Sequence, residues 1–147
     1  MHKDFMMEAL KEARKAYDKG EVPIGAVIVK DGRIVSKAHN LRETLKDATA
    51  HAEMVAIREA CKRLDSWRLS DCSIYVTIEP CPMCAGAILQ ARIVRLIFGA
   101  MDFKAGCAGS IYNFLSDGKF NHTTEIISGI MEDECRNILK KFFEQRR

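Results

Sequence analysis

The sequence lacks any long uncharged apolar run, and none of its 147 residues belongs to a stretch approaching the roughly 20 apolar residues needed to cross a bilayer. The first residues, Met1-His2-Lys3-Asp4-Phe5, are charged and are not followed by the apolar segment of a signal peptide. Repeats, low-complexity tracts and linker-like segments are also missing. We therefore expect one domain over residues 1–147, a cytoplasmic location and no membrane partner.

A strong charge excess is absent as well. The net charge of +3 permits an anionic partner but does not require one. With 48% hydrophobic and 29% charged residues, the composition is typical of a globular protein and excludes a disordered chain.

Closely spaced cysteines are few. Of the six cysteines, only Cys81 and Cys84 lie near each other in the sequence. The other four stand among apolar residues, where a buried free thiol is a better interpretation than a disulfide. These four are Cys61, Cys72, Cys107 and Cys135.

Hydrophobic periodicity predicts alternating helices and strands. We expect helices over 5–20, 51–65, 82–92 and 131–143, strands over 24–30, 33–39, 73–78, 93–98 and 125–128, a loop over 40–50, and a mixed segment over 99–124 with room for a short helix near 112–115. Asp31-Gly32 is a strong hairpin signal between the first two strands. This order predicts an α/β fold, a three-layer sandwich with helices on both faces of one sheet.

A metal site is predicted from His51, Cys81 and Cys84, each near the start of a predicted helix. Zinc favours nitrogen and sulfur ligands, and a catalytic zinc site keeps three protein ligands and one open position. Cysteines three positions apart at a helix start lie on one face, close enough for two sulfurs roughly 3.8 Å apart to reach one ion. The positive helix N-terminus also favours the thiolate form that binds metal.

Glu53 lies two positions beyond His51 and is left over as a spare carboxylate. Zinc lowers the pKa of a bound water from 15.7 to about 7, and a carboxylate beside that water can move its protons. His51, Glu53, Cys81 and Cys84 together form the H-x-E…P-C-x-x-C signature of the zinc-dependent nucleobase deaminases. We therefore predict Glu53 as the catalytic residue.

Other interpretations of the His51, Glu53, Cys81 and Cys84 set account for fewer of these residues. A redox C-x-x-C pair would leave His51 and Glu53 without a role. A structural zinc site would need a fourth ligand, and His39 and His122 lie outside any ligand spacing and are better explained as surface or hydrogen-bonding residues. A zinc module that binds RNA without catalysis would have no use for Glu53.

Over residues 5–147 the sequence closely resembles the bacterial tRNA adenosine deaminases, which convert the wobble adenosine of an anticodon to inosine. The segments that carry this resemblance are Glu21–Val27, Ala38-His39-Asn40, Thr49–Glu53, Tyr75–Gly86, Phe98-Gly99-Ala100 with Asp102 and Lys104, Phe120-Asn121-His122, and Phe142-Phe143. The H-A-E and P-C-P-M-C segments alone would fit a deaminase of free purine or cytosine compounds equally well, which is the alternative function.

The resemblance implies a cytidine-deaminase-like α/β/α sandwich with a five-stranded mixed sheet, a homodimer, one zinc ion per chain, no organic cofactor and a tRNA anticodon stem-loop as partner. It implies substrate contacts from Asn40, Asp102, Asn121, Phe143 and Arg147. Two departures from the family are visible: Ala48 stands where members often have proline, and the sequence ends at Arg147 without a long basic tail. Lys140, Lys141, Arg146 and Arg147 form a basic end that could meet phosphates, or else a solvated helix end.

Overall fold

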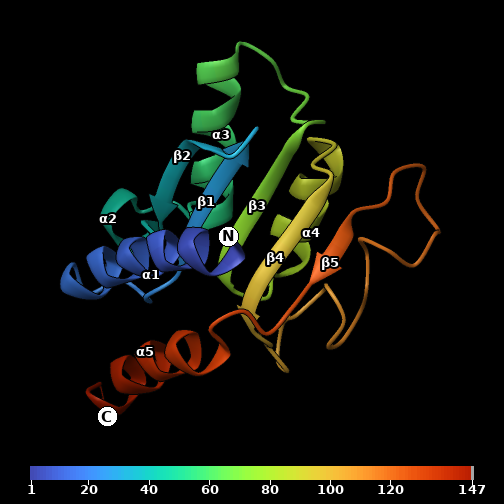
Figure 1. Cartoon of the computed structure of the whole chain (residues 1–147). Helices are drawn as coiled ribbons and strands as arrows, with labels where there is room; N and C mark the ends of the chain where they lie inside the picture. Colours follow the sequence, from blue (N-terminus) through green and yellow to red (C-terminus); the bar gives the residue numbers. More distant parts are fainter. Residues whose placement is uncertain (147) are drawn as a thin grey trace.

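In the computed structural model, which describes residues 1–146, one mixed sheet lies between two layers of helices (Figure 1). The strands follow the order β2-β1-β3-β4-β5 across the sheet. β1 is antiparallel to both β2 and β3, whereas β3, β4 and β5 run parallel. The elements are α1 (His2–Asp18), β1 (Gly25–Lys30), β2 (Arg33–His39), α2 (Arg42–Leu45), α3 (Ala52–Leu64), β3 (Cys72–Ile78), α4 (Pro82–Gln90), β4 (Arg95–Ala100), β5 (Glu125–Ile127) and α5 (Glu132–Glu144).

The sheet buries both of its faces. Because side chains alternate along a strand, Ala26 and Ile28 of β1 pack with α3 and α4 on one face, and Val27 and Val29 pack with α1 and α5 on the other. This confirms the predicted three-layer sandwich and the five-stranded mixed sheet. Across Met1–Arg146, no helix combines the length and the apolar character that a membrane crossing requires.

The predicted hairpin joins β1 to β2. Asp31 and Gly32 both have positive φ angles, 52° and 73°, as a tight two-residue hairpin turn requires. All six cysteines are free thiols, and Cys72, Cys107 and Cys135 are buried as expected, whereas Cys61 is only half-buried.

Two local expectations were wrong. The segment over 40–50 contains the short helix α2, where only a loop was expected. Residues 112–115 do not form a helix: Asn113 instead pairs with Ala108 in an isolated β-bridge, and its side-chain oxygen accepts hydrogen bonds from the N–H groups of Leu115 and Ser116.

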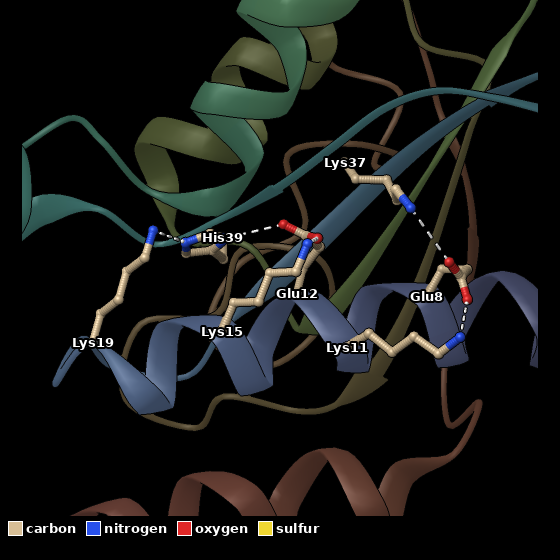
Figure 2. A network of polar contacts seen from close by, with 7 residues as sticks. All are labelled: Glu8, Lys11, Glu12, Lys15, Lys19, Lys37 and His39. Carbon is tan, nitrogen blue, oxygen red and sulfur yellow. Dashed lines mark hydrogen bonds and ion pairs between the residues drawn. The ribbon is translucent and has the colours of Figure 1, made fainter.

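A network of polar contacts holds α1 against the end of β2 (Figure 2). The buried carboxylate of Glu12 accepts hydrogen bonds from His39 Nδ1 at 2.9 Å and from Lys15 Nζ at 2.7 Å. Lys19 Nζ lies 3.0 Å from the other ring nitrogen of His39, so an ammonium donor there fixes the proton on Nδ1, facing Glu12. The network therefore fixes the end of β2 immediately before Asn40.

Candidate active site

The site is formed where the first residues of α3 and α4 meet. His51 is the N-cap residue of α3 and Cys81 is the N-cap residue of α4. An N-cap side chain usually accepts a hydrogen bond from its own helix, but within the described chain neither of these side chains does so. Both are therefore available to each other across the junction.

The three predicted metal ligands lie together. Nδ1 of His51 is 3.6 Å from the sulfur of Cys81 and 3.6 Å from the sulfur of Cys84, and the three donor atoms all lie within 4.8 Å of one another. One nitrogen and two sulfurs, brought together at two helix N-termini, are a donor set that suits zinc. Pro82 occupies the first turn of α4, where its missing N–H costs little, so the C-x-x-C segment enters the helix without strain.

The two thiols differ in their protonation. The hydrogen bond from Cys84 lowers the pKa of Cys81 to about 4 against the opposing effect of burial, and His51 lowers it further. The same hydrogen bond, together with burial, raises the pKa of Cys84. The hydrogen bond to Cys81 likewise raises the pKa of His51. These surroundings favour the thiolate form of Cys81, which is the form that ligates a metal.

Glu53 is buried in the first turn of α3, with 3% of its surface exposed. Burial raises the pKa of its carboxyl group to about 7, since the charged form loses its hydration, and the Cys84 thiol beside it partly opposes this rise. The carboxyl group is therefore adjacent to the donor cluster without belonging to it.

A small cavity of about 80 Å³ lies beside the cluster and contains Asn40 and His51 in its wall. The Asn40 side chain is oriented by two contacts: its Nδ2 donates to the Val22 carbonyl at 3.3 Å, and its Oδ1 accepts from the Arg42 N–H at 3.1 Å. An amide has two N–H groups and two acceptor positions, so each end keeps capacity for a further partner.

Three other predicted contact residues lie outside this cavity. Asp102 is half-buried, and its Oδ1 accepts from the N–H groups of Lys104 and Ala105 within its own turn. Asn121 is exposed and lines a separate cavity of about 240 Å³ that runs along α4 from Pro82. Phe143 is 51% exposed, whereas its neighbour Phe142 is buried. Arg147 lies outside the described residues.

Two buried carboxylates near the site were not predicted from the sequence. Burial alone would raise the pKa of Glu21, but hydrogen bonds from the hydroxyl and N–H of Thr44 and from the N–H of Glu43 hold it below its usual value. The pKa of Glu79 is likewise lowered against burial by donors from the segment over 102–110. The only sequence signal was an acidic residue directly beside a β-rich run, as at Ile78-Glu79.

The sandwich fold and the His-Cys-Cys cluster beside a buried glutamate define a nucleobase deaminase of the cytidine-deaminase-like class. A family model of the MafB19-like deaminases matches residues 1–147. The chain belongs to this family. Its similarity to individual proteins also groups it with the tRNA-specific adenosine deaminases.

The chain is 54% identical to the tRNA-specific adenosine deaminase of Bacillus subtilis over 143 residues, which are 97% of this chain and 89% of that protein. A solved structure from a study of A-to-I editing by tRNA:A34 deaminases at the wobble position of transfer RNA superposes with a TM-score of 0.89. It is 48% identical, and the match covers 92% of this chain and 99% of that one. A guanine deaminase from Bacillus subtilis is 44% identical with a TM-score of 0.68, over 75% of this chain and 71% of that one. The predicted family resemblance is confirmed.

Proposed function

We propose that this protein catalyses the hydrolytic deamination of adenosine to inosine at the wobble position of a tRNA anticodon. The observation that carries the proposal is the cluster of His51, Cys81 and Cys84 beside the buried Glu53. Support for tRNA as the substrate comes from the identity of 54% to a tRNA-specific adenosine deaminase over nearly the whole chain.

The donor set fits zinc, and His51, Cys81 and Cys84 would hold it with one coordination position left over. The ion would supply a Lewis acid that makes a water molecule nucleophilic at neutral pH. One imidazole and two thiols make up the three protein ligands of a catalytic zinc site, so no fourth residue is needed to bind the ion.

Glu53 would move the protons of the reaction. It accepts a proton from the attacking water and delivers it to N1 of the adenine ring as the water oxygen bonds to C6. A second proton, which leaves the hydroxyl group now bonded to C6, then passes through Glu53 to the exocyclic amino group. The C6–N6 bond breaks, the C6 carbonyl forms, and ammonia leaves. The products are inosine and ammonia, and Glu53 is returned to its starting state.

The other contacts that we propose follow from position and chemistry. Asn40, in the cavity wall beside His51, would hydrogen-bond the target nucleoside. Asn121 and the exposed ring of Phe143 would meet the anticodon loop, where unpaired bases stack on aromatic rings. We assign the same role to Asp102 and Arg147 from the family resemblance. A loop adenosine suits such a site, since extruding a base from a duplex costs a few kcal/mol.

We further propose one domain over residues 1–147, a homodimer and a cytoplasmic enzyme that acts on tRNA there. The assembly can be measured by light scattering on the purified protein.

The test is incubation with an anticodon stem-loop that bears a wobble adenosine, followed by nucleoside analysis for inosine and elemental analysis for zinc. We expect inosine at the wobble position only and about one zinc ion per chain. A stem-loop with guanosine at that position and free adenosine serve as controls, and both should react far more slowly. Equal activity on free nucleosides or bases would overturn the assignment to tRNA.

A further inference from the structure

Glu79 follows β3 and stands two positions before Cys81. Its side chain is only 2% exposed, and its carboxylate accepts four hydrogen bonds from a single loop. Oε1 accepts from the Asp102 N–H at 3.0 Å and from the Ser110 hydroxyl. Oε2 accepts from the N–H groups of Ala108 and Ser110, each at 2.9 Å. We call residues 102–110 the Glu79 loop.

The Glu79 loop is folded tightly around this carboxylate. A Cβ atom at Gly106 would lie 2.5 Å from the Asp102 carbonyl oxygen and closer still to the carboxyl carbon of Glu79. The Cys107 N–H donates to the Pro80 carbonyl at 2.9 Å. The loop therefore packs directly against the residue that precedes the ligand Cys81.

The outer side of the loop carries groups that suit a nucleic acid. Phe103 is 75% exposed, more than any other aromatic side chain in residues 1–146, and Lys104 beside it is also exposed. An exposed ring can stack on an unpaired base, and an ammonium group can meet a phosphate. Neither side chain packs in the interior, because the loop is held by its hydrogen bonds to the buried Glu79 carboxylate.

We propose that Glu79 is a positioning residue that fixes the Glu79 loop beside Cys81 as a recognition element for the RNA around the target base. The proposal rests on the proposed function and deepens it. Four donors converge on the two oxygens of Glu79, and only a carboxylate offers enough acceptor capacity. An amide would place an NH₂ group against N–H donors and release one side of the loop. A free nucleoside lacks the RNA on either side of the target base, so we expect its turnover not to change when the loop is released.

The experiment compares Glu79→Gln with the milder Ser110→Ala, which removes one donor and leaves the carboxylate. The packing control is Ile74→Val, a mild change in the buried part of β3 that alters no residue of the loop and none of the metal ligands. For each protein, kcat and KM are measured on the stem-loop, with turnover of free adenosine, zinc content and thermal unfolding. We expect KM for the stem-loop to rise about tenfold in Glu79→Gln and less in Ser110→Ala. Zinc content, kcat and the slow turnover of adenosine should stay within about twofold of the wild type.

Two results would overturn the proposal. One is an unchanged KM in a folded Glu79→Gln protein. The other is an equal loss of activity on stem-loop and free adenosine, which would assign Glu79 to support of the metal site alone. If Glu79→Gln does not fold, the KM of Ser110→Ala decides in the same way.

A failure of the proposed function can be told apart from a failure of this proposal. If the wild type does not deaminate the stem-loop, the proposed function is wrong. The positioning role of Glu79 is then tested by amide hydrogen exchange in the loop and by the affinity of each variant for the stem-loop. Faster exchange at the amides of Ala108 and Ser110, with weaker stem-loop binding in Glu79→Gln than in Ile74→Val, would support the positioning role. Equal exchange and binding in the two variants would overturn it.

Discussion

At the scale of single residues, the site depends on which side chains stand at the first positions of two helices. His51 and Cys81 occupy N-cap positions, so each lies at the positive end of a helix and extends away from it. Glu53 stands two positions after His51, in the first turn of α3, and its side chain is buried. The proposed metal donors and the proposed proton carrier thus stand at different backbone positions, and substitution can test them one at a time.

Glu53→Ala should remove activity but not the metal. The carboxyl group lies outside the donor cluster, so zinc content and thermal unfolding should remain close to those of the wild type. Loss of a positioned acid–base group is expected to lower kcat by about 10²–10⁴-fold. Glu53→Gln, which keeps the shape of the buried side chain, should lose as much activity as the alanine variant. Near-normal turnover in either variant would show that another group moves the proton.

Cys84→Ala should instead lose the metal. Removing one of three protein ligands leaves two donors, so the purified variant should contain well under one zinc ion per chain and should have no activity. The matched control is Cys72→Ala, which removes a buried thiol at the start of β3, the end of that strand away from Cys81, and keeps all three donors. Elemental analysis of both proteins gives the answer, and fully active Cys84→Ala enzyme without zinc would contradict the assignment.

At the scale of elements, the contact between α1 and β2 depends on one buried carboxylate. Burial would raise the pKa of Glu12, but hydrogen bonds from His39 and Lys15 and the charge of Lys15 hold it below its usual value of 4.5 (Figure 2). A carboxyl group whose pKa is lowered by folding stabilises the fold above its unfolded pKa. This stabilisation is lost as the pH falls through the folded value.

Glu12→Gln should therefore lower the free energy of unfolding at pH 7 by about 1–3 kcal/mol, because it removes a charged acceptor that two donors share. The difference from the wild type should shrink as the pH falls below about 4.5, the usual pKa of the unfolded carboxyl group, and should be lost once the pH has passed the lower pKa of the folded one. Denaturant unfolding from pH 7 to pH 3 measures both effects. The control is Glu8→Gln, which removes a more exposed partner of Lys11 and Lys37 on the same helix and should cost much less. A difference that did not vary with pH would show that packing, not charge, is responsible.

Local patterns predicted the long elements because each buries a continuous face. α3 shows this with buried alanines at helical spacing, and β1 with an unbroken apolar run that is buried on both faces of the sheet. α2 was not predicted since four residues are too few to show a helical period, and its first N–H groups are held by Glu21 from outside the segment. The bridge between Ala108 and Asn113 likewise depends on tertiary contacts that leave no periodic signal.

At the scale of the whole molecule, the metal donors could be predicted because the chemistry restricts both residue type and spacing. His51 and Cys81 are thirty positions apart in the sequence, and only the packing of α3 on α4 brings them together. The support around them was not predictable in the same way. Glu79 reaches a loop that begins at Asp102, and a buried glutamate gives no sequence signal that separates it from an exposed one.

The basic end of the chain also differs from what its sequence suggests. Arg146 stacks on the ring of Phe142 at 4.3 Å from the ring centroid, and its Nη2 donates to the Gly20 carbonyl at 2.9 Å. Arg146 thus ties the end of α5 to the end of α1. Lys140 and Lys141 are exposed, and neither side chain hydrogen-bonds to another group among residues 1–146. They are therefore better candidates for phosphate contacts, whereas Arg147 lies outside the described residues.

We therefore predict that Lys140→Ala with Lys141→Ala weakens binding of the stem-loop and flattens its salt dependence. Each lost phosphate contact should reduce the slope of log K against log salt by about 0.7 on a single-stranded segment. Activity at saturating stem-loop should fall much less, because these lysines would bind RNA and do not reach the metal site. Lys30→Ala with Lys62→Ala is the control of equal charge: Lys30 ends β1 and Lys62 lies in the last turn of α3, away from the His51 end of that helix. The measurement is the binding affinity for the stem-loop from low to high salt. A slope that fell equally in both double variants would show a diffuse effect of net charge. An unchanged slope in Lys140→Ala with Lys141→Ala would show that the end of α5 is only a solvated surface.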